Sequence, residues 1–146
     1  MANAQTPKLD PDTFLPPPPA WSGISEKLIV PEKDPWITPS EKTGLTATPT
    51  YDETISWLRK VDRQSALLRI GPMGTTPQGR KLVAVILSKD GASFQPSKPV
   101  FLIQAGIHSG EIDGKDAMLM LIRDICFKGR DELIDRVNIV FIPVLN

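Results

Sequence analysis

Apolar and polar residues alternate with a helical period in the middle of the chain. Three apolar residues fall on one helical face, at i, i+4 and i+7: Tyr51, Ile55 and Leu58. This spacing predicts an amphipathic helix. Thr50 and Glu53 have the spacing of a capping box, in which each side chain satisfies a free backbone N–H of the first turn. The helix is therefore expected to begin at Thr50 and to end near Ser65.

Continuous apolar runs indicate β-strands on the C-terminal side of this helix. Four runs have the length of a strand: residues 66–70, 81–87, 99–107 and 137–145. A link rich in glycine and proline separates the first two runs, so we expect these two to pair antiparallel. The last two runs lack the alternation of a strand with one face in water, and we expect both of their faces to be buried.

Residues 113–127 predict a second amphipathic helix, between the third and fourth apolar runs. Its apolar face consists of Met118, Leu121, Ile122 and Ile125. Asp116, Arg123 and Asp124 occupy the opposite, polar side. A strand, a helix and a strand in this order imply a parallel pair with a right-handed crossover. The predicted fold class is therefore α/β, with a mixed parallel and antiparallel sheet flanked by helices.

The first 50 residues differ in texture because they hold ten of the 15 prolines, including the unbroken run Pro16 to Pro19. Proline has no backbone N–H to give to a helix or a central strand. We therefore expect residues 1–48 to be an extended, Pro-rich arm and residues 49–146 to be the folded domain. Trp21, Trp36 or residues 28–30 would pin the arm to that domain. The four prolines suit either a stiff spacer or a ligand for an aromatic groove.

Charge and cysteine content exclude several classes of function. Lys and Arg number 17 and so do Asp and Glu, so the net charge is zero, and we expect neither nucleic acid nor an anionic membrane surface as a partner. No apolar run approaches the roughly 18 residues of a membrane span. The single cysteine, Cys126, excludes an internal disulfide framework and is expected to be a small core residue. The single histidine, His108, excludes metal sites that need two histidines from this chain.

Candidate chemistry gathers at the end of the third apolar run, in residues 104–111. Ligands of open α/β sheets bind at the carboxyl ends of parallel strands. We expect His108 to be the first residue after the strand and Glu111 to lie in the first turn of the next helix, where the two side chains can hold one divalent ion. Gly106 and Gly110 suit the tight reversal. The same turn could instead bind a phosphate on backbone N–H groups, whereas its glycines do not have dinucleotide-loop spacing.

Three segments, in order and spacing, resemble the N-terminal part of the M14 family of zinc carboxypeptidases. They are residues 70–80, Gly106–Glu111 and Val140–Asn146, and the similarity runs from about Thr50 to the last residue. The resemblance implies a zinc carboxypeptidase-like fold, incomplete at the C-terminus. It also implies a metallocarboxypeptidase that hydrolyses the C-terminal bonds of peptides or proteins. His108 and Glu111 would be the first two Zn²⁺ ligands.

The same resemblance implies that the third ligand, the residues that hold the substrate carboxylate and the general-base Glu lie beyond residue 146. The isolated chain would then be inactive. Gly110 stands where the digestive members of the family have Arg, so their peptide preference is not transferred. Two alternatives stay open. One is a zinc-dependent deacylase of N-acyl amino acids, similar to succinylglutamate desuccinylase and aspartoacylase, and the other is a non-catalytic fragment.

Several further residues leave two interpretations each. Asp113 and Asp116 suit the first turn of a helix because negative charge is favoured there, and they could also support His108 from behind. Arg80 either reaches toward the site or caps the edge of the sheet. Residues 2–4 match the small-x-small pattern before a signal-peptidase cut, although no charged and apolar segment precedes them. Together with the family resemblance, this pattern favours export to the periplasm or the extracellular space.

Overall fold

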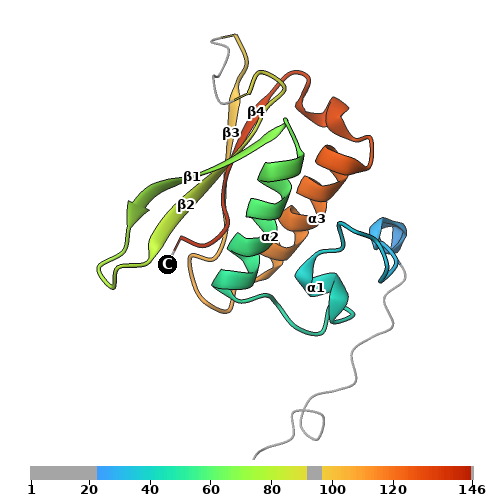
Figure 1. The fold of residues 1–146 in the computed structure, drawn as a ribbon, viewed down its shortest axis with the longest axis horizontal. Helices are drawn as coiled ribbons and strands as arrows, with labels where there is room; N and C mark the ends of the chain where they lie inside the picture. Colours follow the sequence, from blue (N-terminus) through green and yellow to red (C-terminus); the bar gives the residue numbers. More distant parts are fainter. Residues whose placement is uncertain (1–22, 92–96, 146) are drawn as a thin grey trace, which may run out of the picture.

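Two long helices lie against one face of a four-stranded sheet in the computed structural model, which describes residues 23–91 and 97–145 (Figure 1). The strands are β1 (Leu68–Thr75), β2 (Lys81–Leu87), β3 (Val100–Gln104) and β4 (Asn138–Ile142). The long helices are α2 (Tyr51–Gln64) and α3 (Asp113–Phe127), and α1 (Pro39–Lys42) is a single turn. Short 3-10 helices span Ile24–Leu28 and Asp131–Ile134. None of the helices in these ranges is long and apolar enough to cross a membrane.

The two long helices form where the sequence predicts them. Thr50 and Glu53 close the capping box at the start of α2, and Ser65 is the residue at its C-terminal end. The core lies between the sheet and these helices, with Leu58 and Val61 of α2 fully buried there. Helix α3 begins and ends at the predicted residues, and its apolar face contributes Leu119, Ile122 and Ile125 to the same core.

The sheet has the predicted mixed topology, in the order β1-β2-β4-β3. Strands β1 and β2 pair antiparallel, as do β2 and β4, whereas β3 and β4 pair parallel across the α3 connection. Strand β1 extends further than expected because the link rich in glycine and proline continues to pair with β2, with a bulge between Pro72 and Gly74. The carboxyl ends of β3 and β4 therefore meet at one edge of the sheet.

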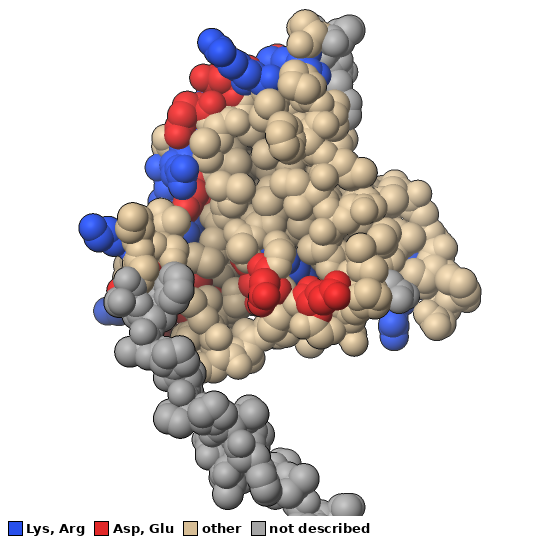
Figure 2. Space-filling view, turned by 180° about the vertical axis from the view of Figure 1, so that it is seen from behind, with Lys and Arg blue, Asp and Glu red and all other residues tan. Residues whose placement is uncertain are grey.

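Strand β3 corrects one prediction, because it is exposed on both faces. It occupies the edge of the sheet, and Phe101 and Leu102, which point to opposite faces, are each 59% exposed. The side of the molecule opposite to the view of Figure 1 also has few charged side chains across its middle (Figure 2). A continuous apolar run predicts a strand, but burial depends on the neighbours that the strand finds. Strand β4, which has a neighbour on each side, is buried as predicted.

The expectation of an extended arm is wrong for two described segments, the 3-10 helix Ile24–Leu28 and α1. Helix α1 forms because Thr38 and Glu41 make a second capping box and Pro39 occupies the first turn, where its missing N–H costs nothing. Trp36 does pin this region to the domain, since its ring stacks on Phe127 with the centroids 3.6 Å apart. Trp21 and the four prolines lie outside the described residues, and the boundary after residue 48 stays a prediction.

Buried charges fasten the same N-terminal segment to α3. Arg123 Nη1 donates to the Glu41 carboxylate, and neither side chain has any exposed surface. Arg123 Nη2 donates to the carbonyl of Leu28 at 2.7 Å, and Nε donates to Asp124 at 2.8 Å. The predicted polar side of α3 is therefore covered by the N-terminal segment and is not exposed to water.

Candidate active site

The predicted site lies in the loop between β3 and α3, at the carboxyl edge of the parallel pair (Figure 1). Strand β3 ends at Gln104, so His108 follows it by four residues rather than directly. Glu111 lies two residues before α3 and not in its first turn. Both residues therefore belong to the loop. The loop is longer than predicted, because the strand ends at Gln104 and not at residue 107.

His108 and Glu111 nevertheless converge. The distance between His108 Nδ1 and Glu111 Oε1 is 2.8 Å, and the Glu111 N–H donates to the His108 carbonyl at 3.0 Å. This backbone bond closes a turn that brings the two side chains to the same side of the loop. The His108 side chain is 74% exposed and that of Glu111 is 64% exposed, so a ligand can reach both from solvent.

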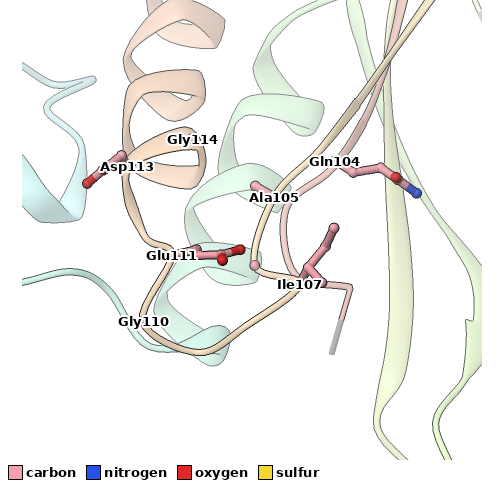
Figure 3. A pocket seen from close by; sticks show the side chains of 8 residues that line it. Gln104, Ala105, Ile107, Gly110, Glu111, Asp113 and Gly114 are labelled. Carbon is pink, nitrogen blue, oxygen red and sulfur yellow. The ribbon is translucent and has the colours of Figure 1, made fainter.

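A pocket of about 310 Å³ lies between the loop and the start of α3, lined by residues 104–107, 110–111 and 113–114. The Glu111 carboxylate points across the loop toward Ala105 and Ile107 (Figure 3). The Asp113 carboxylate points to the opposite side, away from Glu111 (Figure 3). Both acids line the pocket, but their carboxylates do not converge on one point.

The first half of the loop is held against the end of β4. Ala105 N–H donates to the Ile142 carbonyl at 2.9 Å, and the Ala105 carbonyl accepts from Leu145 N–H at 3.2 Å. Gly106 follows with a positive φ of 60°. A Cβ at this position would lie 3.1 Å from the Val144 Cα and 3.2 Å from the Pro143 carbonyl oxygen. Gly106 therefore serves both the turn and the close approach of two backbone segments.

Replacing Gly106 with alanine is expected to lower the free energy of unfolding by about 1–3 kcal/mol, the cost of holding a non-glycine residue in the left-handed region. The added methyl group must also push back backbone atoms that cannot move alone. Gly110→Ala is the matched control, since no atom lies within 4 Å of a Cβ built there and its φ is not positive. Urea denaturation of both variants measures the difference, and equal midpoints would contradict the role of Gly106.

A buried lysine holds the other end of the loop. Lys115, in the first turn of α3, is 5% exposed, and its Nζ donates to Thr48 Oγ1 at 2.7 Å, to the Pro49 carbonyl at 3.0 Å and to Asp116 at 2.8 Å. Asp116 also accepts from Thr48 at 3.1 Å, so its carboxylate serves this contact and not His108. Lys115 was not predicted from the sequence. The available signal was a cation in the first turn of a helix, where the helix dipole disfavours positive charge.

Cys126 is half-buried and packs against the core, as predicted. Burial raises the pKa of its thiol, and a hydrogen bond with Ser65 opposes this effect only in part. A raised pKa disfavours the reactive thiolate at neutral pH. Cys126 is therefore a packing residue rather than a nucleophile.

The donor set at the loop suits a borderline metal such as zinc, because imidazole nitrogen and carboxylate oxygen both bind Zn²⁺ at about 2.0–2.2 Å. His108 Nδ1 and Glu111 Oε1, at 2.8 Å from each other, need to move apart only slightly for one ion to reach both. In residues 23–91 and 97–145, no group of three His, Cys, Asp or Glu side chains could hold a metal ion. Catalytic zinc sites usually have three protein ligands, so this loop provides a partial donor set.

A family model described as zinc carboxypeptidase matches residues 54–146, which is more than half of the chain and includes the loop, α3 and both parallel strands. The chain belongs to the zinc carboxypeptidase family. The resemblance drawn from the three sequence segments is therefore confirmed, and so is the predicted fold class.

Solved structures of carboxypeptidases share this fold. Carboxypeptidase A from Helicoverpa armigera matches with a TM-score of 0.61 and 24% identity over 68% of this chain and 24% of its own. Thrombin-activatable fibrinolysis inhibitor matches with a TM-score of 0.62 and 18% identity over 76% of this chain and 28% of its own. A metallo-carboxypeptidase from Burkholderia cenocepacia matches with a TM-score of 0.57 and 21% identity over 66% of this chain and 26% of its own. The chain thus spans about a quarter of the length of these structures.

Proposed function

We propose that the protein containing this chain is a zinc-dependent metallocarboxypeptidase in which His108 and Glu111 are two of the zinc ligands. The convergence of His108 Nδ1 and Glu111 Oε1, 2.8 Å apart at the carboxyl edge of the sheet, carries this proposal. Membership of the zinc carboxypeptidase family supports it. The substrate is the C-terminus of a peptide or protein.

The remaining functional groups come from outside these 146 residues. The family resemblance implies a second histidine ligand, and because this sequence has one histidine, we propose that the second lies elsewhere in the protein. The general-base glutamate and the groups that hold the substrate carboxylate are proposed to lie there as well. We propose that the protein is exported to the periplasm or the extracellular space, which the Ala-Asn-Ala pattern at residues 2–4, outside the described residues, supports.

The chemistry divides between the ion and the chain. When bound by His108 and Glu111, a zinc ion would supply Lewis-acid chemistry, which polarises a peptide carbonyl and lowers the pKa of a water. His108 offers Nδ1 as a neutral donor, which requires that the ring carry its proton on Nε2. Glu111 adds a negative charge. Gly110 leaves open space beside it, because it has no side chain and no atom lies within 4 Å of a Cβ built there. Substrate can therefore approach the loop from solvent.

Removal of the metal tests this function. Treatment of the full-length protein with a chelator is expected to reduce release of the C-terminal residue from a peptide to background, and added Zn²⁺ is expected to restore it. The same peptide with an amidated C-terminus should not be cleaved. The 146-residue chain should release nothing even with zinc, because it lacks a third ligand and a base.

Two results would contradict the proposal. Peptide cleavage that survives complete removal of zinc would exclude zinc catalysis. Zinc-dependent cleavage of N-acyl amino acids in preference to peptides would favour the deacylase alternative.

A further inference from the structure

A second pocket lies at the same edge of the sheet as His108 and Glu111. Its volume is about 330 Å³, at the small end of the range for ligand sites. Strand β2 runs antiparallel to β4, so its first residues lie beside the chain that leaves β4 (Figure 1). The polar lining comes from the start of α2 and the β1–β2 turn: Tyr51, Thr76, Gln78, Arg80 and Lys81.

The two pockets are neighbours. Val144, which lines the second pocket, lies against Gly106, which lines the first. A Cβ built on Gly106 would be only 3.1 Å from the Val144 Cα. The short segment from Pro143 to Val144 therefore separates the second pocket from the loop that carries His108 and Glu111. One extended ligand can lie across both.

The second pocket is positively charged. Arg80 and Lys81 line it, and no acidic residue does so. The backbone of Arg80 is fixed by the turn, since its N–H donates to Thr76 Oγ1 at 3.2 Å and its carbonyl accepts from Thr76 N–H at 2.8 Å. Its guanidinium makes no hydrogen bond or ion pair in the described part of the chain. Among the described residues, the Lys81 Nζ contacts only the Thr75 hydroxyl, at 3.3 Å.

Several other cations of the described residues pair with an acid. Lys89 contacts Asp131 and Asp135, Lys128 contacts Asp34, and Arg123 contacts Glu41 and Asp124. The Tyr51 hydroxyl, which donates to the Lys81 carbonyl, sets the wall of the pocket beside Lys81. Among the described residues neither Arg80 nor Lys81 pairs with an acid, so the pocket lining carries two positive charges without an anion.

We propose that this pocket binds an acidic side chain of the substrate, with Arg80 as the principal partner. A guanidinium can donate two parallel hydrogen bonds to a carboxylate, and Lys81 adds a second positive charge. The proposal rests on the proposed function in one respect, because it takes the ligand to be a peptide that also reaches His108 and Glu111. A chain-terminal carboxylate shares this chemistry, but the groups that hold it are proposed to lie outside these 146 residues, so an acidic side chain is the expected ligand. The proposal also gives Arg80 a role at the site rather than at the sheet edge alone.

Calorimetric titration of the full-length protein with three probes distinguishes these sources. N-acetyl-glutamate α-amide has only the side-chain carboxylate, N-acetyl-glutamine has only the terminal one, and N-acetyl-glutaminamide has neither. N-acetyl-glutamate α-amide is expected to bind more tightly than the neutral probe, and Arg80→Gln is expected to weaken it about tenfold, the effect of losing one charge-assisted hydrogen-bonded contact. An effect of Arg80→Gln on N-acetyl-glutamine alone would assign the pocket to the terminal carboxylate and overturn the proposal.

Arg63→Gln is the matched control, because Arg63 is an exposed cation of α2 that does not line the pocket. It should bind both acids as the wild type does. Equal affinity for the neutral probe, or equal effects of Arg80→Gln and Arg63→Gln, would overturn the proposal. The titrations are repeated with His108→Ala. If that change leaves zinc content unaffected, the metal assignment fails, whereas the response of Arg80→Gln still decides the carboxylate pocket.

Discussion

His108→Ala is expected to lower the zinc affinity of the full-length protein by more than about 100-fold. Changes in residues that only support a ligand already cost about 10–100-fold, and this change removes a ligand atom itself. Glu111 would be left with a carboxylate that lacks its partner at 2.8 Å. Zinc content after dialysis against a competing chelator measures the affinity, and release of a C-terminal residue should fall to background in parallel.

The same substitution should leave stability almost unchanged, which separates loss of the metal from loss of the fold. The His108 side chain is 74% exposed, and its hydrogen bond in the described residues is the one to Glu111. Surface changes of this kind are usually within about 0.5 kcal/mol. Asp113→Asn is the matched control, since it removes an acid near the loop whose carboxylate points away from Glu111 (Figure 3). Normal zinc binding by His108→Ala would refute the assignment.

Elements with local signals could be predicted from the sequence, whereas their burial could not. The capping box at Thr50 and Glu53 and the apolar face of residues 113–127 are complete within a few turns, so α2 and α3 were found at their true bounds. Strand β3 has the composition of an interior strand, but its position at the edge is decided by β4 and not by its own residues. Helix α1 was not predicted, because the high proline content was taken to exclude helices, whereas proline is favourable in a first helical turn.

The candidate site was predicted in part for the same reason. His108 and Glu111 are three residues apart, so the turn that joins them is a local feature, and their convergence follows from one backbone hydrogen bond. The contacts that hold the loop are not local. The hydrogen bond from Lys115 to Thr48 joins residues that are 67 positions apart. Gly106 lies against Val144 only because β3 and β4 are paired. Sequence patterns contain no direct signal for either contact.

Arg123 of α3 gives the second large effect, on stability rather than on metal binding. Burial opposes its charge, but hydrogen bonds to Asp124 and Glu41 outweigh burial and raise its pKa, so the guanidinium stays charged in the core. Arg123→Met would leave the Glu41 carboxylate buried without its cation. Breaking a buried ion pair from one side typically costs about 3–5 kcal/mol, and we expect a loss of that size in the free energy of unfolding.

A double-mutant cycle in urea tests whether the loss comes from the pair itself. Glu41→Gln combined with Arg123→Met removes both charges, and the double variant is expected to be more stable than the sum of the single changes by about 1–3 kcal/mol. Lys89→Met is the control, because Lys89 pairs with Asp131 and Asp135 at the surface, where ion pairs contribute little. Additive single changes, or a loss no larger than that of Lys89→Met, would mean that Glu41 and Arg123 do not fasten the N-terminal segment. A large coupling would instead make residues 28–41 an integral part of the domain, since this pair joins α1 to the helix that follows the candidate site.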